Sequence, residues 1–390
     1  MTFTLNWGIL GCGGIAETFT KDLLLDPKSH RNVDVIHKVV ATGSSSSVDK
    51  AKKFAETTGA KDAKHYGSYE ELVKDENVDV IYVATPHSHH YANAMLALEA
   101  GKNVLCEKAF TVNAGQARKL VETARAKNLF LMEAQWTRYF PLSIELRRMI
   151  SSGELGDIKQ IFSDNGKSIE HIDRITNPNL AGGALLDLGV YSFLHIFQTV
   201  YHLDPEHTKP EVKAAILKDE KTGVDKFTTA ILAWPGTTAI ATCNYSLESD
   251  PKSDYSAGPC VRIVGTKAQV CIPSPPYRPT SFTVIPNGDG EVQKNDFPIE
   301  GGNGMWWEAD EVAFCIRDGK KESEIMPLDE SVVPGGARDV GCEAHGTLTS
   351  RWKANIPLSH RSGIRSNSYI AHYYTNRQRL WVTPIPQPNQ

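Results

Sequence analysis

The 390-residue sequence lacks the features that mark nucleic-acid-binding, membrane-spanning and secreted proteins. Its formal net charge is only -4, so there is no basic field to concentrate a nucleic acid or an anionic membrane. No uninterrupted apolar run approaches the length that crosses a bilayer. The stretch containing Asn6, Gly8 and Gly11 leaves no room for the apolar core of a signal peptide. We expect a small-molecule ligand, with no nucleic-acid partner and no membrane partner.

Cysteine is scarce, and its seven copies form no Cys-x-x-Cys pair. Such scattered cysteines indicate reduced thiols and therefore a cytoplasmic protein. Cys106, next to Glu107, could act as a nucleophile, but a free cysteine is more often a small core residue. His87, His89 and His90 could bind a metal, yet no carboxylate or thiolate accompanies them at a useful spacing on the expected strand end. We predict no metal site.

The first third of the sequence contains a long series of alternating strand and helix patterns. Residues 7–10 form a short apolar strand, and a helix with one apolar face follows over residues 14–25. The alternation continues to a helix over residues 113–127, which requires crossover connections and a parallel sheet covered on both faces. We predict an α/β domain with a doubly wound parallel sheet over residues 1–135.

Residues 136–333 have a different pattern, in which apolar and polar residues alternate between turn residues. This pattern predicts an α+β substrate domain with a largely antiparallel open sheet. We expect a homodimer through the open face of that sheet, because an exposed apolar sheet would otherwise aggregate. The strands are expected within residues 226–234, 238–246 and 261–272, and the helices over residues 142–152, 185–200 and 305–318.

Residues 334–390 differ from both domains. They carry seven Lys and Arg against only Asp339 and Glu343, and they lack clear periodicity until their aromatic end. We expect this atypical tail to be poorly ordered, and we hypothesise that it comes from a shifted reading frame or a retained intron. Peptides such as residues 366–377, recovered from natural protein, would contradict that hypothesis.

The turn between the first strand and the first helix carries a dinucleotide-binding pattern. Gly11 permits a tight turn, Gly13 lets the backbone approach a pyrophosphate, and the small Ala16 allows helix and strand to pack closely. A Rossmann domain is therefore predicted. Gly14 and Ile15 complete the expected cofactor-binding loop.

The end of the second strand bears on the choice between NAD and NADP. Enzymes that use NAD usually place an acid there, and that carboxylate repels a 2′-phosphate. This chain instead has four successive serines after Gly43, and Ser44, Ser45 and Lys50 could hold a phosphate. The pattern favours NADP. The alternative is a solvated serine loop with no part in cofactor selectivity.

Lys108 follows a predicted strand at the carboxyl edge of the parallel sheet, where ligands of such folds bind. Partly desolvated beside the cofactor, its ammonium could have a lowered pKa and exchange a proton with a substrate hydroxyl. The alternative from spacing alone is a solvated surface lysine.

Three separated blocks of sequence resemble the Gfo/Idh/MocA oxidoreductase family. They comprise residues 104–142 together with GILGCGGIA, residues 182–197 and residues 263–273. The resemblance spans roughly residues 5–333 and is strongest to the branch of dimeric dihydrodiol dehydrogenases and fungal NADP-dependent D-xylose 1-dehydrogenases.

The resemblance implies specific catalytic residues. The family's catalytic lysine falls on Lys108, although Ala109 replaces the usual proline. The family's aspartate and tyrosine fall on Asp187 and Tyr191, whose spacing puts them on one helix face. Tyr191 would relay the proton of the substrate hydroxyl, while Lys108 lowers its pKa or holds the oxygen. From the residues alone, Tyr191 would be a half-buried core tyrosine and Asp187 a helix-start residue.

The same resemblance implies roles for residues around this centre. Trp136 and Arg138 are expected to form the wall between cofactor and sugar, and Arg174 to reach the substrate from a loop. Trp136 could otherwise be a packing residue. The remaining residues expected to face the cofactor are Thr85, Pro86, His87, His90 and Glu107.

The favoured function is NADP-dependent oxidation of an aldose, D-xylose or a relative, at C1 to the lactone. The nearest alternative is oxidation of trans-1,2-dihydrobenzene-1,2-diol. An alternative of another class is a non-catalytic regulator that senses NADP, since Rossmann domains also serve such roles.

Overall fold

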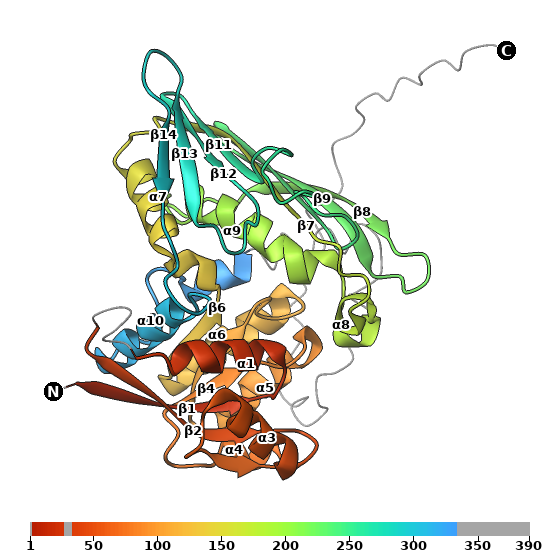
Figure 1. The fold of residues 1–390 in the computed structure, drawn as a ribbon, viewed down its shortest axis with the longest axis vertical. Helices are drawn as coiled ribbons and strands as arrows, with labels where there is room; N and C mark the ends of the chain where they lie inside the picture. The colour runs from red at the N-terminus through yellow and green to blue at the C-terminus, as the bar shows by residue number, and fades with distance from the viewer. Residues whose placement is uncertain (1, 27–32, 334–390) are drawn as a thin grey trace, which may run out of the picture. The chain divides into compact units, whose positions relative to one another are not determined.

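The computed structural model describes residues 2–26 and 33–333, which form two β-sheets with their helices (Figure 1). The predicted tail, residues 334–390, lies outside the described residues. The first sheet has the strand order β3-β2-β1-β4-β5-β6, and every neighbouring pair is parallel. Its strands are β1 (Phe3–Leu10), β2 (Val35–Gly43), β3 (Lys64–Tyr66), β4 (Val80–Val83), β5 (Asn103–Glu107) and β6 (Leu131–Ala134).

Helices cover both faces of this sheet, as a doubly wound fold requires. Their ends follow local sequence chemistry: Ser47 and Asn113 accept hydrogen bonds from first-turn N–H groups of α3 and α6, and Gly59 ends α3 in a left-handed conformation. The expected fold class is confirmed. The helices are α1 (Gly14–Leu23), α3 (Val48–Thr58), α4 (Tyr69–Leu72), α5 (His87–Glu99) and α6 (Ala114–Lys127).

The second sheet has the order β14-β13-β12-β11-β7-β10-β9-β8 and is antiparallel except for the β7–β10 pair. Its strands are β7 (Ile158–Gly166), β8 (Glu211–Lys218), β9 (Asp225–Trp234), β10 (Thr237–Asn244), β11 (Val261–Gly265), β12 (Ala268–Ile272), β13 (Ser281–Pro286) and β14 (Gln293–Asp296). The sequence predicted β9 to β12 but not the other four strands.

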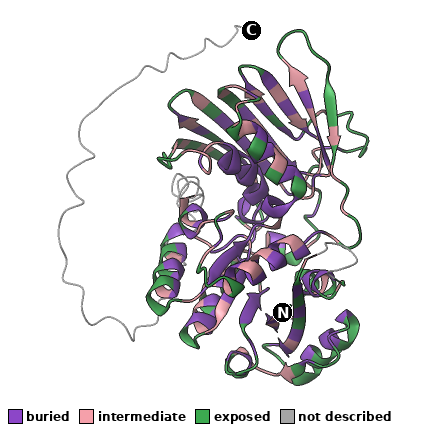
Figure 2. Cartoon of the chain, turned by 90° about the vertical axis from the view of Figure 1, so that its left-hand side faces the viewer, coloured by how far each residue is buried: buried purple, intermediate pink, exposed green. Residues whose placement is uncertain are grey.

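One face of the second sheet packs on α7 (Pro141–Ser151) and α9 (Val190–Thr199), whose apolar side chains share a core with alternate strand residues. Every residue of α9 is buried, and Figure 2 shows this helix in purple beneath strands that alternate buried and exposed positions. The other face carries exposed apolar side chains, including Leu217 at 63% and Ile231 at 50% exposure. Helix α9 continues η3 (Leu185–Gly189), which is a π-helical turn. The helix predicted over residues 185–200 therefore begins with a turn that is wider than an α-helical turn.

Residues 178–199 contain the one helical stretch in the described chain that is long and apolar enough to span a membrane, a stretch that the sequence analysis did not single out. Inside the protein 94% of that apolar window is buried. Its apolarity therefore serves the core of the second domain.

Helix α10 (Trp306–Arg317) requires a correction to the predicted domain of residues 136–333. Its side chains Ala309, Val312 and Ala313 belong to the core of the first sheet, and the helix lies beside α1 (Figure 1). A buried contact of 2.9 Å between His37 Nε2 and Asp310 Oδ1 fixes it there. The amphipathic face of α10 thus returns the chain to the first domain.

A second correction concerns His87, His89 and His90, which were expected on a strand end and loop. They lie in the first turns of α5, because Pro86 is the extended N-cap residue that separates β4 from this helix. Among residues 2–26 and 33–333, no group of three His, Cys, Asp or Glu side chains has an arrangement that could hold a metal ion.

Candidate active site

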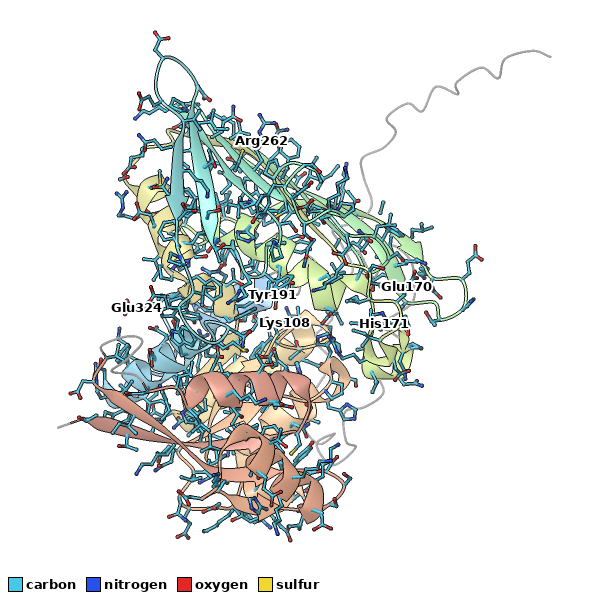
Figure 3. All side chains as sticks on the ribbon, in the orientation of Figure 1. Lys108, Glu170, His171, Tyr191, Arg262 and Glu324 are labelled. Carbon is cyan, nitrogen blue, oxygen red and sulfur yellow. The ribbon has the colours of Figure 1, made fainter. Side chains whose placement is uncertain are left out.

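Lys108 from the first domain and Asp187 and Tyr191 from the second converge at one point. Lys108 Nζ donates to Asp187 Oδ1 at 3.1 Å and to the Asp187 backbone oxygen at 2.9 Å. The same nitrogen lies 5.0 Å from the centre of the Tyr191 ring. Figure 3 labels Lys108 and Tyr191 side by side at the junction of the two sheets. The structure therefore brings the three predicted catalytic side chains together.

Local structure explains this convergence. Lys108 directly follows β5, at the carboxyl edge of the parallel sheet, and Tyr191 follows Asp187 by one turn of the η3–α9 helix. Asp225, at the start of β9, accepts a hydrogen bond of 2.6 Å from the Leu185 N–H at the beginning of that helix. The second sheet thereby fixes the end of the helix that carries Asp187.

The charges at this centre differ from the expectation for Lys108. Burial alone would lower the pKa of Lys108, but Asp187, Tyr191 and Glu107 hold it above its ordinary value. Burial would raise the pKa of Asp187, yet the Lys108 and Arg174 charges hold it well below its usual range. The expected lowered pKa of Lys108 is therefore wrong. The site contains an ammonium paired with a carboxylate, so Lys108 donates hydrogen bonds and does not act as a base.

Tyr191 is buried and oriented by a donor. Trp136 Nε1, on η1 (Trp136–Tyr139), donates to the Tyr191 hydroxyl oxygen at 3.0 Å. Indole can only donate, so the phenol keeps its own proton for another acceptor. Burial raises the pKa of Tyr191 to about 12, and the Lys108 charge acts against that rise. The geometry combines a phenol that can exchange a proton with a cation that stabilises its phenolate.

Arg174 and His87 complete the surroundings of Asp187. Arg174 Nη1, on α8 (Asp173–Thr176), donates to Asp187 Oδ1 at 2.8 Å, and its side chain is 49% exposed. His87 Nε2 lies 4.0 Å from the same oxygen. Burial lowers the pKa of His87 to about 3, so the imidazole is neutral. Arg174 therefore reaches this centre from a short helix and not from a loop, with its guanidinium paired to the carboxylate, and its contact with the substrate stays a prediction.

The glycine loop before α1 has the form that a dinucleotide needs. Gly11 has a φ of 109°, and a Cβ there would lie 2.8 Å from the Ala84 backbone oxygen, so the turn excludes other residues. Among the described residues, nothing beyond the adjacent chain lies within 4 Å of a Cβ built at Gly13 or Gly14. The N-cap residue Gly13 offers no side-chain acceptor to the first N–H groups of α1, which can therefore bind a pyrophosphate. Ile15 and Ala16 follow in the first turn of that helix.

The end of β2 carries no acid. Ser44 is buried and its hydroxyl contacts that of Ser46, whereas Ser45 is exposed. Lys50 lies in the first turn of α3, directly after the serines, and its N–H donates to Ser47. Hydroxyls, backbone N–H groups and a lysine thus follow β2, and these groups fit a 2′-phosphate.

The other residues that were expected to face the cofactor lie between the end of β4 and the end of β5. His90 Nε2 contacts the Thr85 backbone oxygen at 2.7 Å, and His90 Nδ1 contacts the Ala109 backbone oxygen at 2.8 Å. Tyr82 donates to Glu107 Oε1 at 2.5 Å, and the Lys108 N–H lies 3.2 Å from Glu107 Oε2. Burial raises the pKa of Glu107 to about 6. These contacts position the backbone around Lys108.

Arg138 does not reach this centre. It is 1% exposed, and its guanidinium forms a buried ion pair with Glu330. Arg138 therefore cannot form part of the expected wall, because its side chain points into the core, and the role of Trp136 in that wall stays a prediction. Cys106 is also inert: it is fully buried, and burial holds the pKa of its thiol well above the ordinary value.

Two residues that the sequence analysis missed lie beside Tyr191. Lys167 Nζ donates to the Tyr277 hydroxyl at 2.9 Å, and the Tyr277 ring centre is 5.7 Å from that of Tyr191. Lys167 directly follows β7, a strand that was not predicted, and Tyr277 lies in a proline-rich loop without periodicity. The strand end after β7 was the signal that could have found Lys167.

Comparison with known proteins agrees with this architecture. A model described as an oxidoreductase family with an NAD-binding Rossmann fold matches residues 5–135, and one for the GFO/IDH/MocA C-terminal domain matches residues 144–271. The fold is shared with the aldose-aldose oxidoreductase from Caulobacter crescentus, with a TM-score of 0.72 and 22% identity over 87% of this chain and 98% of that one.

Relatives of higher identity are two kinds of dehydrogenase. The D-xylose 1-dehydrogenase (NADP(+)) of Hypocrea jecorina is 51% identical over 351 residues, which cover 85% of this chain and 89% of that protein. The trans-1,2-dihydrobenzene-1,2-diol dehydrogenase of Bos taurus is 38% identical over 336 residues, which cover 84% of this chain and 92% of that protein. The chain therefore belongs to the Gfo/Idh/MocA oxidoreductase family.

Proposed function

We propose that this enzyme oxidises an aldose, D-xylose or a close relative, at C1 to the lactone with NADP as cofactor. The observation that carries the proposal is the convergence of Lys108, Asp187 and Tyr191, with Lys108 Nζ 3.1 Å from Asp187 and 5.0 Å from the Tyr191 ring. The 51% identity to an NADP-dependent D-xylose 1-dehydrogenase supports the substrate and the cofactor. The absence of an acid after β2 supports NADP over NAD.

The chain's own side chains bind the sugar and move its proton. An ammonium has three N–H bonds, and Asp187 takes two of those of Lys108 among the described contacts. The third can bind the C1 hydroxyl oxygen, next to the phenol that Trp136 orients. Tyr191 first passes its own phenol proton to solvent, and the resulting phenolate, which Lys108 stabilises, then accepts the hydroxyl proton. Bound at the glycine loop, NADP supplies the hydride acceptor.

Substitution of the two central residues tests this assignment. Lys108→Met and Tyr191→Phe should each lower kcat for D-xylose by about 100-fold or more, the usual size of a general acid–base effect. For Tyr191→Phe, NADP binding and thermal unfolding should stay close to those of the parent. Lys108→Met also removes a partner of the buried Asp187, so its thermal unfolding is measured beside kcat to separate lost folding from lost chemistry. Lys119→Met, on the surface of α6, is the matched control. Unchanged kcat in both variants would refute the assignment, and the same assay with NAD in place of NADP tests the cofactor.

Oxidation of trans-1,2-dihydrobenzene-1,2-diol is the second candidate, which the 38% identity to such dehydrogenases favours. A higher kcat/KM for the benzene dihydrodiol than for D-xylose would overturn our choice of substrate. An NADP-sensing regulator would instead bind NADP without turnover of either compound, and the assembled Lys108, Asp187 and Tyr191 argue against it.

The enzyme is also proposed to act as a cytoplasmic homodimer on a small sugar, without nucleic-acid or membrane partners. The exposed apolar face of the second sheet supports the dimer. The free thiols of the six cysteines in the described chain support a reducing compartment.

A further inference from the structure

Lys167 and Tyr277 form a polar pair that the proposed chemistry does not use. Lys167 Nζ lies 2.9 Å from the Tyr277 hydroxyl and 5.0 Å from the centre of the Tyr277 ring. Both side chains are half-buried, whereas the neighbouring Tyr191 is buried. The pair is therefore partly exposed, and its tyrosine ring lies 5.7 Å from that of Tyr191.

The elements of the active site hold this pair in place. Thr137, next to Trp136, donates to the Tyr277 backbone oxygen at 2.6 Å. His195, one helical turn after Tyr191, contacts the Pro276 backbone oxygen at 2.8 Å. The two helices that position the reacting phenol thus also position the loop that carries Tyr277.

The hydrogen-bond chemistry of the pair leaves its donors available. Lysine can only donate, so Tyr277 accepts from Lys167 and keeps its own proton for another acceptor. Lys167 has three N–H bonds, and its contact to Tyr277 uses one of them. Donors of this kind, one of them charged, suit the hydroxyl oxygens of a sugar.

We propose that Lys167 and Tyr277 bind hydroxyl groups of the aldose other than the one that is oxidised, and so select polyhydroxylated substrates over aromatic diols. This inference rests on the proposed function and adds the residues that discriminate between its two candidate substrates. An aldopentose ring has further hydroxyls beyond C1, whereas a benzene dihydrodiol has only its two reacting-end oxygens. Without sugar hydroxyls, the donors of this pair would be desolvated without acceptors, which costs binding energy.

Kinetics of Lys167→Met and Tyr277→Phe test the inference. Each substitution should raise KM for D-xylose about tenfold, the effect of one lost charge-assisted hydrogen bond, and change kcat by less than about threefold. The kcat/KM for benzene dihydrodiol should stay the same or rise. Lys167→Arg, which keeps the charge and donors, should recover most of the lost affinity. Lys159→Met, on the strand β7 that Lys167 follows, and Tyr255→Phe are matched surface controls.

Deoxy analogues of D-xylose separate recognition from a structural effect. The Tyr277→Phe change should lower kcat/KM for D-xylose about tenfold but leave it unchanged for the one analogue that lacks the hydroxyl bound by Tyr277. An equal loss for every analogue, or an unchanged KM for D-xylose in both variants, would overturn the inference while the proposed function stands. No turnover of D-xylose by the unsubstituted enzyme would overturn the proposed function, and this inference with it.

Discussion

Glu308 on α10 is a carboxyl group buried without a hydrogen-bond partner in the described part of the chain. Its residue exposure is 0%, and neither carboxyl oxygen has a partner there. Burial, reinforced by the nearby Glu107 and Asp22, holds the pKa of Glu308 well above its ordinary value. The folded state therefore favours the protonated form of this side chain, and its ionisation opposes folding.

This burial predicts a pH dependence of stability. A carboxyl whose pKa is raised by folding contributes most below its unfolded pKa of about 4.3, and the contribution is lost as pH rises toward the folded pKa. Glu308→Gln removes the titration, so its Tm relative to the parent should increase between about pH 5 and about pH 8. Thermal unfolding at both pH values checks this. Glu122→Gln, with a 66% exposed side chain, should show no such change, and an equal Tm difference at both pH values would contradict us.

At the level of single residues, the sequence analysis anticipated the convergence of Lys108, Asp187 and Tyr191, whose catalytic roles stay predictions. The strand-end position pointed to Lys108, whereas the family resemblance singled out Asp187 and Tyr191, and their four-residue spacing indicated only that they share a helix face. Arg138 was placed wrongly because its guanidinium pairs with the buried Glu330, which lies 192 positions away in the sequence. Such pairings depend on tertiary packing that local pattern does not encode.

The helix that carries Asp187 and Tyr191 depends on its start. Asp225 accepts from the Leu185 N–H at 2.6 Å and from the Thr228 hydroxyl at 3.2 Å, and burial raises the pKa of its carboxyl to about 7. For stability, the Asp225 carboxyl matters more as a hydrogen-bond acceptor than as a charge, because a buried N–H without a partner costs about 1–3 kcal/mol. This single acceptor thus links β9 to the catalytic helix.

We therefore expect Asp225→Ala to lower the free energy of unfolding by about 1–3 kcal/mol and to reduce kcat, because the helix start loses its acceptor. Asp225→Asn, which keeps an acceptor oxygen, should preserve most of both. Denaturant unfolding and steady-state kinetics measure the two effects. If alanine and asparagine behaved alike, the capping role of Asp225 would be wrong.

The elements themselves were predictable where periodicity is strong. Most of the alternating strands and helices of the first domain were found, and so were β9 to β12, because their apolar residues recur at the expected spacing. The short elements β3, α4 and β6 were not predicted. β14 reads QKND and has no apolar pattern, and β8 is an edge strand whose residues are never fully buried. These segments form strands because they pair with a neighbouring strand, and their own sequences do not predict strands.

At the scale of the whole molecule, we predict that the open face of the second sheet forms the interface of a homodimer. Ile231 is 50% exposed on β9 and pairs across the sheet with Ile240 of β10. Ile231→Lys should convert a dimer into a monomer, because a buried charge at an apolar interface is costly. Light scattering coupled to gel filtration measures the mass. Ile144→Lys, at a 48% exposed position on α7, should leave the dimer intact, and a parent enzyme that is already monomeric would contradict the prediction.

The return of α10 to the first sheet has a consequence for biosynthesis. Met305, Val312 and Met326 complete a core that begins with Leu5 and Trp7, so the ribosome must make the whole second domain before the first can close. Until then, the part of this core that α10 covers remains exposed on the nascent chain and open to chaperones. The N-terminal half therefore cannot complete its core until α10 has been synthesised, some 300 codons downstream, as the numbering of Trp7 and Val312 shows.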